Sequence, residues 1–243
     1  MPETARASLA WWRAHYRFNR LACGDMDPSW WPSLRHGHLA RRLADCERAR
    51  RAVSVHLYQQ QGLNPDAWHE CRDVPACYGL LPPALLQALL RRLGLVLAAP
   101  AIIAEIRRPH LEHIRQQLGA DFVFARQRVP LLGVTVDMTP PVPHDAQPWP
   151  QHALALGYAW ARLAWADCDA DWHGRVRWKL PAALPAAPGR PDTPPPAWLW
   201  PKLLYELDRP WQDFLASHGT SPAPPDLASS AQTTTGRSST PES

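Results

Sequence analysis

The stretch LLPPALLQALLRRLG, from Leu80 to Gly94, indicates the fold class of this chain. Its leucines recur three or four residues apart, which is the spacing of one face of an α-helix. Two prolines stand at its start and a glycine at its end, the order that favours helix starts and stops. We therefore predict a helix from Pro82 to Gly94. The apolar residues from Leu95 to Ala99 that follow fit a strand or a helix equally well.

The same punctuation by proline and glycine recurs along the chain. Pro100 and Pro109 each begin a predicted helix, and Gly62 ends an earlier, longer one. The last predicted helix contains Pro210, which lacks a backbone donor and kinks or breaks a helix. The helices that the periodicity predicts cover residues 5–23, 34–61, 82–94, 100–108, 109–119, 121–125, 151–167 and 198–215.

These helices predict an all-α fold, an irregular bundle of several helices with Pro-rich connectors. One connector runs from Val134 to Pro150, where the sequence leaves open whether residues 134–137 form a strand. The tail is rich in Ser, Thr and Pro, a composition typical of disorder. The domain organisation that we predict is a helical domain at 1–180, a Pro/Ala-rich linker at 181–197, a C-terminal amphipathic helix at 198–216 and a disordered tail at 217–243.

The composition excludes several classes of protein. The chain has 243 residues, 46% of them hydrophobic, and its 13 tryptophans are too much apolar surface for a disordered chain. The longest uncharged apolar run, Leu93 to Ala104, is shorter than the roughly 20 residues of a membrane span. The N-terminus shows no basic and apolar leader, and the five cysteines are an odd number. We therefore expect a cytoplasmic protein with reduced thiols.

The positive charge of the chain is concentrated in one predicted helix. The segment from Arg35 to Arg51 contains six arginines and only two acidic residues, Asp45 and Glu47. Its net charge of +4 therefore equals that of the whole chain. Arginine makes bidentate contacts to carboxylate and phosphate groups. The segment is therefore a solvated helix face, a docking surface for an acidic protein or a nucleic-acid contact, and it shows no helix-turn-helix signature.

Catalytic motifs are missing from the sequence. There is no glycine-rich phosphate loop, no G-x-S-x-G nucleophile turn and no H-E-x-x-H zinc motif. Three groups of potential metal ligands have spacings that fit a site poorly, and a structural role is the alternative for each of them. These groups are Asp167, Asp169 and Asp171 with His173; His69 with Cys71 and Cys77; and His110 with Glu112 and His113.

Two stretches of the chain follow the pattern of a known family. Asp27-Pro28-Ser29-Trp30 comes directly after the first predicted helix, and the leucine-rich helix continues through Leu93-Gly94-Leu95 to a helix that ends in Leu118-Gly119-Ala120-Asp121. This pattern resembles the SctK-type (YscK-type) accessory proteins of bacterial type III secretion systems, in particular their Hrp branch. The resemblance covers roughly residues 27 to 132 and consists of apolar patterns. The Pro-rich segments and the tail have no counterpart in it.

The resemblance implies a non-enzymatic cytosolic adaptor without a cofactor. Such a protein bridges the SctD-type inner-membrane ring protein and the SctQ-type C-ring-like scaffold protein of the sorting platform, at the cytoplasmic face of the inner membrane. It implies neither a nucleic-acid partner nor insertion into the membrane. Arginine and tryptophan are enriched at interface hot spots. The partner-binding residues that we expect are Arg41, Arg42, Arg48, Trp30, Trp31, Trp198 and Trp200.

Two other functions remain open from the residues alone. The first is a metal-dependent enzyme that uses Asp167, Asp169, Asp171 and His173. The second is a transcriptional regulator that places the arginine-rich helix on DNA.

Overall fold

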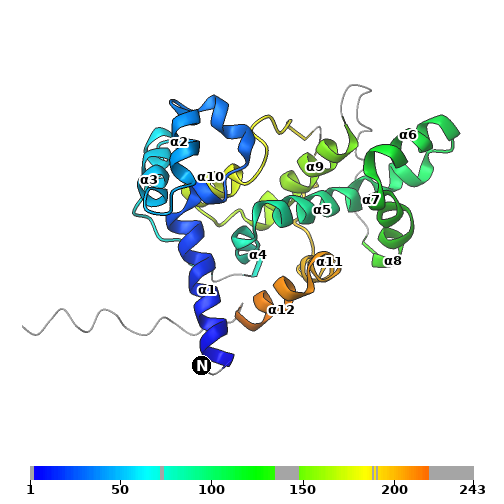
Figure 1. Ribbon diagram of the computed structural model, residues 1–243. Coiled ribbons are helices and arrows are strands. Elements are labelled where there is room, and N and C mark those ends of the chain that lie inside the picture. Colours follow the sequence, from blue (N-terminus) through cyan, green and yellow to red (C-terminus); the bar gives the residue numbers. More distant parts are fainter. Residues whose placement is uncertain (1–2, 72–73, 135–147, 188, 190, 219–243) are drawn as a thin grey trace, which may run out of the picture.

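Two long apolar helices lie side by side at the centre of the computed structural model (Figure 1). They are α5 (Pro83–Ala104) and α9 (Trp149–Ala164). The helices cross at Gly94 and Gly157, where their backbones touch. A Cβ atom on Gly157 would lie 1.7 Å from the carbonyl oxygen of Leu90, so only glycine fits there. This crossing lets α5 and α9 pack backbone against backbone.

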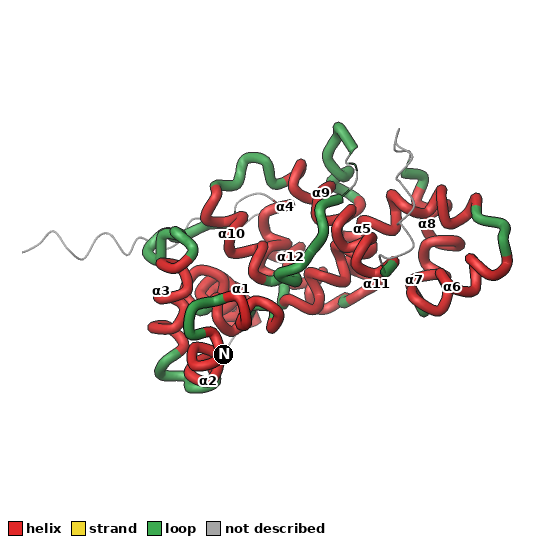
Figure 2. The backbone as a smooth tube through the Cα atoms, turned by 90° about the horizontal axis from the view of Figure 1, so that it is seen from above, coloured by secondary structure: helices red, strands yellow, loops and turns green. Residues whose placement is uncertain are grey.

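The prediction of an all-α fold is confirmed. The structure describes residues 3–71, 74–134, 148–187, 189 and 191–218, and this part of the chain contains twelve α-helices and no strand (Figure 2). Short 3₁₀ turns and one π-helical turn, Phe124–Arg128, connect them. The other helices are α1 (Glu3–Arg20), α2 (Gly37–Ala44), α3 (Arg50–Gln60), α4 (Val74–Cys77), α6 (Arg108–Leu118), α7 (Ala120–Val123), α8 (Val129–Leu132), α10 (Ala170–Trp178), α11 (Leu199–Leu207) and α12 (Arg209–His218).

Helix α5 is longer than the sequence pattern predicts. The predicted stop at Gly94 and the predicted start at Pro100 are both wrong, because one helix runs through both residues. Residues 95 to 99 are therefore helical, and all five are buried between the neighbouring helices. The packing of these side chains outweighs the backbone hydrogen bond that a proline inside a helix removes.

The predicted helix at 34–61 is also wrong, because the chain forms two helices there. His36 adopts a left-handed conformation with φ of 56° directly before α2, and a turn at residues 45–49 separates α2 from α3. The arginine-rich segment therefore consists of α2, a turn and α3, and we call this arrangement the α2 and α3 corner. The predicted stop at Gly62 is confirmed, since this glycine has a φ of +68°.

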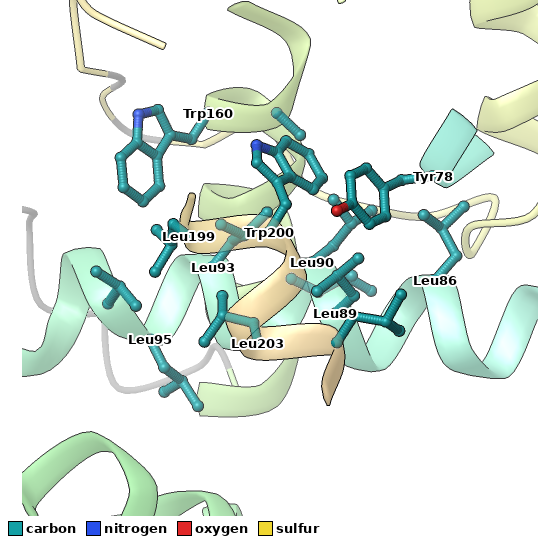
Figure 3. Close-up of a cluster of buried hydrophobic side chains, with 14 of the residues drawn as sticks. Tyr78, Leu86, Leu89, Leu90, Leu93, Leu95, Trp160, Leu199, Trp200 and Leu203 are labelled. Atoms are coloured by element: carbon teal, nitrogen blue, oxygen red, sulfur yellow. The ribbon is translucent and has the colours of Figure 1, made fainter. Parts of the chain in front are cut away.

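The main hydrophobic core lies around α5 and α9. Tyr78 stacks on Trp200 with ring centroids 4.9 Å apart (Figure 3). The ring of Trp165 lies 5.6 Å from the same indole. Trp200 belongs to α11, which also buries three leucines in this cluster. The helix predicted at the C-terminal end of the chain is therefore packed onto the core, and it breaks at Asp208, before Pro210, as predicted.

A second, smaller core lies between α2, α3 and α10. Trp31, Leu57 and Tyr58 are buried in it, and Trp178 stacks on Tyr58 with a centroid distance of 5.4 Å. Helix α10 was not expected from the sequence. It supplies Trp178 to this core and Trp172 to the main one, so it joins the two.

Helix α5 is the one described helix that is long and apolar enough to cross a membrane. Its 18-residue window has a mean hydropathy of 1.6, and 61% of that window is buried inside the protein. Leu86, Leu89, Leu90 and Leu93 have no exposed surface at all (Figure 3). This burial is consistent with the core helix of a soluble protein.

Some predictions fall on residues that the structure does not describe. The possible strand at 134–137 lies outside the described residues except for Val134, and most of the Pro-rich loop that follows it does too. The predicted disordered tail lies outside them from residue 219 onward. The linker at 181–197 is not helical where it is described, and the Trp160 indole donates to the Thr193 carbonyl at 2.9 Å.

Candidate functional site

The candidate site is a basic surface on the corner formed by α2 and α3. We define it by five arginines, whose residues are all exposed and which make no ion pair with any described residue. Elsewhere in the described chain, arginines such as Arg91 and Arg108 do pair with carboxylates. The five guanidinium groups are therefore available to an incoming partner. The basic surface consists of Arg35, Arg41, Arg42, Arg48 and Arg51.

Two leucines of α2 are exposed beside these arginines. Leu39 and Leu43 lie one helical turn apart and are nearly half exposed. The inner face of the same helix is formed by Gly37 and Ala40, which are buried. A Cβ atom on Gly37 would lie 1.7 Å from the carbonyl oxygen of Trp31, so glycine lets the helix start close against the second core. The surface thus combines aliphatic contacts with positive charge.

The tryptophans expected at a partner interface have different positions. Trp31 and Trp200 are 6% and 1% exposed, so their rings belong to the two cores. Trp30 is half-buried, and its indole donates to the Leu180 carbonyl at 2.8 Å. Trp198 is 47% exposed at the start of α11. Of these four rings, Trp198 is the one that presents a large open surface.

The carboxylates near α10 serve the fold in the described structure. Asp169 caps α10, because its Oδ1 accepts from the Trp172 N–H at 2.7 Å. Its Oδ2 lies 3.2 Å from Nδ1 of His69. Asp171 accepts from the backbone N–H of Asn64 at 3.0 Å. The Asp169 and Asp171 side chains therefore bond to different segments of the chain.

The predicted metal-ligand groups do not converge. Among the described residues, no three His, Cys, Asp or Glu side chains lie close enough together to hold a metal ion. Asp167 is exposed, whereas burial and the nearby Arg162 hold the pKa of His173 below its usual value. The structure therefore does not gather Asp167 and His173 with Asp169 and Asp171 into one set of ligands.

Hydrogen bonds link Cys77 to Cys71 and, separately, His69 to Asn19. The Cys77 thiol donates to the Cys71 carbonyl at 3.2 Å, and the Asn19 amide bonds to both the N–H and the carbonyl of His69. The contact with Cys77 and burial raise the pKa of the Cys71 thiol well above its usual value. Since the thiolate is the form that binds metals, this environment favours a structural thiol.

The group on α6 is exposed and paired locally. His113 lies 2.6 Å from the Gln117 amide, and Arg108 bonds to Glu112 at 3.1 Å. His110 lies 3.3 Å from Glu105 at the end of α5. The three polar side chains therefore have separate partners on the surface.

Glu105 allows a pH prediction. Hydrogen bonds from the Arg107 guanidinium and the Arg107 backbone N–H lower the pKa of Glu105 to about 2, with a smaller contribution from His110. The stabilisation by this carboxylate is therefore present above its unfolded pKa of 4.5 and is lost as the pH falls through about 2. A carbon-13 NMR titration of the Glu105 carboxyl group measures this, and Arg107→Ala is expected to return the midpoint toward 4.5. A wild-type midpoint near 4.5 would contradict the prediction.

Two buried cations were missed at the sequence level. Arg175 donates to the Asn19 carbonyl at 2.6 Å and to the Asn64 carbonyl at 2.8 Å, and its guanidinium lies over the Tyr58 ring. Lys179 follows one turn later and is also buried. The signal in the sequence is the stretch WHGRVRWK, in which these cations stand close to two tryptophans. A helix end that lies in solvent has no need of two tryptophans, so the stretch indicates a buried helix.

Comparison of the chain with protein-family models, with curated proteins and with solved structures gives no match.

Proposed function

We propose that this protein is a non-enzymatic adaptor of a bacterial type III secretion apparatus. In this proposal the chain bridges the SctD-type ring protein and the SctQ-type scaffold protein at the cytoplasmic face of the inner membrane. The family assignment rests on the resemblance of residues 27 to 132 described above. The observation that carries the adaptor role is the basic surface of α2 and α3.

The charge of the basic surface indicates an acidic protein partner. Five exposed arginines on α2, α3 and the turns beside them make no ion pair with a described residue, so they leave positive charge in water that a partner with carboxylates would neutralise. Asp45 and Glu47 lie between them, and Leu39 and Leu43 add exposed aliphatic surface. Acidic and aliphatic groups within the surface suit a protein better than a phosphate backbone, which carries only negative charge at its contacts.

Reversal of two central charges tests the site. The double variant Arg41→Glu, Arg42→Glu is expected to weaken binding of the acidic partner about tenfold or more, because each reversal replaces an attraction by a repulsion. Both side chains are exposed and make no ion pair with a described residue, so the fold should be unchanged. Pull-down of purified ring and scaffold proteins measures the binding, and circular dichroism checks the fold.

A matched control comes from the other end of the molecule. Arg115 and Arg128 are exposed around α6 and α8, far along the chain from the basic surface. Reversing both to glutamate changes the net charge by the same amount and should leave binding intact. Equal losses in the two double variants would indicate a non-specific charge effect and would remove the α2 and α3 corner from the proposal.

The partner itself is identified by affinity purification. The tagged full chain is recovered from its native cell and the bound proteins are identified by mass spectrometry. Recovery of the scaffold and ring proteins would support the proposal, and their absence from cells that express a secretion system would refute it. Retention of a DNA fragment with a steep salt dependence would instead favour the regulator.

A further inference from the structure

A groove of about 330 Å³ lies between α1 and α12, beside the segment that leads into α5 (Figure 1). Trp211 and Phe214 of α12 line it, with ring centroids 5.0 Å apart, and so do Leu80 and Pro82. Sites for small ligands have volumes from about 300 Å³ upward, so the groove has room for a large apolar side chain. The residues of α1 that line it are Ala10, Arg13, Ala14 and Arg17.

The open charge of this groove is positive. Of the described residues that line it, Asp25 is the one with a carboxylate, and it is 4% exposed and pairs with Arg17 and Lys179. Arg13 is exposed and makes no ion pair with a described residue. An apolar groove with an unpaired guanidinium beside it suits a ligand that combines an apolar side chain with a carboxylate.

An exposed apolar stripe on α1 continues the surface of the groove. It consists of Leu9, Trp12 and Tyr16, which are each nearly half exposed and lie on one face of the helix because they are three and four residues apart. Consecutive residues of a helix point about 100° apart, so Arg13 lies between this stripe and the wall of the groove at Ala10. Exposed apolar patches beside charged groups mark interaction sites on soluble proteins.

We propose that the groove and the stripe dock an acidic segment of a partner protein that carries large apolar side chains. One apolar side chain fills the groove between α1 and α12, and a neighbouring carboxylate accepts from the Arg13 guanidinium. Further apolar side chains of the segment cover the stripe. The inference goes beyond the adaptor proposal and does not rest on it, because none of these residues belongs to the basic surface of α2 and α3.

A second copy of this chain fits the same surface less well. Helix α1 contains four arginines, and its acidic residue, Glu3, stands at its start. A contact between two α1 helices would bring the arginines of one copy against those of the other, which is unfavourable. An acidic partner neutralises the same charges, so charge complementarity favours it.

The test is calorimetric titration of the full chain with three peptides that are acetylated and amidated at their ends. The peptide Asp-Leu-Asp-Leu combines carboxylates with large apolar side chains, and we expect saturable binding with a Kd on the order of 1 mM. Asp-Ala-Asp-Ala lacks the large side chains, and Lys-Leu-Lys-Leu reverses the charge. Each of these two should bind at least about fivefold more weakly.

Variants of α1 locate the binding. Arg13→Glu should weaken binding of Asp-Leu-Asp-Leu about fivefold or more, because it replaces an attraction by a repulsion. Ala10→Trp places a large side chain at the edge of the groove and should weaken binding by a similar factor. Both residues are exposed, so the two variants should fold, which circular dichroism checks.

A matched control is Arg115→Glu on α6. Arg115 is also exposed and makes no ion pair with a described residue, so this variant changes the net charge equally and should leave the Kd unchanged. The double variant Arg41→Glu, Arg42→Glu should also bind the peptide with an unchanged Kd. This result separates the groove from the basic surface, so either proposal can fail without the other.

Four outcomes would overturn the proposal. The first is no saturable heat from Asp-Leu-Asp-Leu up to about 20 mM. The second is equal binding of either comparison peptide. The third is an effect of Arg13→Glu no larger than that of Arg115→Glu, or a loss of binding in the Arg41→Glu, Arg42→Glu variant. The fourth is self-association of the wild type in sedimentation velocity that Ala10→Trp abolishes, which would assign the surface to a second copy.

Discussion

Replacement of Gly157 by alanine is expected to lower the free energy of unfolding by about 3 kcal/mol. Helix propensity alone would give the opposite sign, since alanine is better than glycine inside a helix by about 1 kcal/mol. The clash decides the outcome, because the new Cβ would lie 1.7 Å from the Leu90 carbonyl oxygen and 2.8 Å from the backbone nitrogen of Gly94. Both atoms are backbone, so α5 and α9 must move apart.

Urea unfolding followed by circular dichroism measures this loss as a lower midpoint. Gly24→Ala is the matched control, since a Cβ there meets no atom within 4 Å. We expect Gly24→Ala to change the stability by less than about 1 kcal/mol. A midpoint for Gly157→Ala equal to that of the control would show that the helices do not touch at this crossing.

The second large effect is expected at Lys179. Its ammonium donates to the carbonyls of Gly79 and Leu81 at 2.9 Å each and lies 3.5 Å from Asp25 Oδ2, with both charged side chains almost fully buried. Lys179→Met keeps the length of the side chain but leaves two buried carbonyls without this donor and Asp25 with Arg17 alone. We expect a loss of about 3 kcal/mol, typical of breaking a buried ion pair from one side.

Two further variants separate this effect from a general loss of positive charge. Lys202→Met removes the other lysine of the chain, which lies near the exposed Trp198 ring, and should change the stability by less than about 0.5 kcal/mol. Adding Asp25→Asn to Lys179→Met removes the buried carboxylate charge, which then has only the half-exposed Arg17 as its partner, and should recover about 1 kcal/mol. A loss in Lys179→Met no larger than in Lys202→Met would contradict the prediction.

The sequence predicted the helices well where one face is apolar and the neighbours are local. The spacing of leucines in α5 and the glycine stops at Gly62 and Gly119 are of this kind. Gly94 was misinterpreted, because a glycine at a helix end and a glycine at a helix crossing look alike in sequence. The difference depends on Gly157, which lies far along the chain.

The candidate sites were predicted in part. The exposure of Arg41, Arg42 and Arg48 follows from charge, which keeps arginine in water unless it is paired. Which tryptophan rings are buried depends on the packing of helices that are distant in sequence. The spacing of tryptophans along the chain therefore could not predict it. The meeting of His69 with Asp169 is also tertiary, since Asn19 of α1 fixes the segment that carries His69.

The contacts between residues 27–30 and residues 178–182 have a consequence for synthesis. Asp27 donates its N–H to the Trp178 carbonyl, Trp30 bonds to Leu180 over a separation of 150 residues, and Ser29 accepts from the N–H of Ala182. Trp178 also completes the core around Tyr58. The first helices therefore leave the ribosome long before the residues that enclose them exist. The N-terminal region should therefore complete its fold only after residues 178–182 have been made, and its apolar surface needs protection until then.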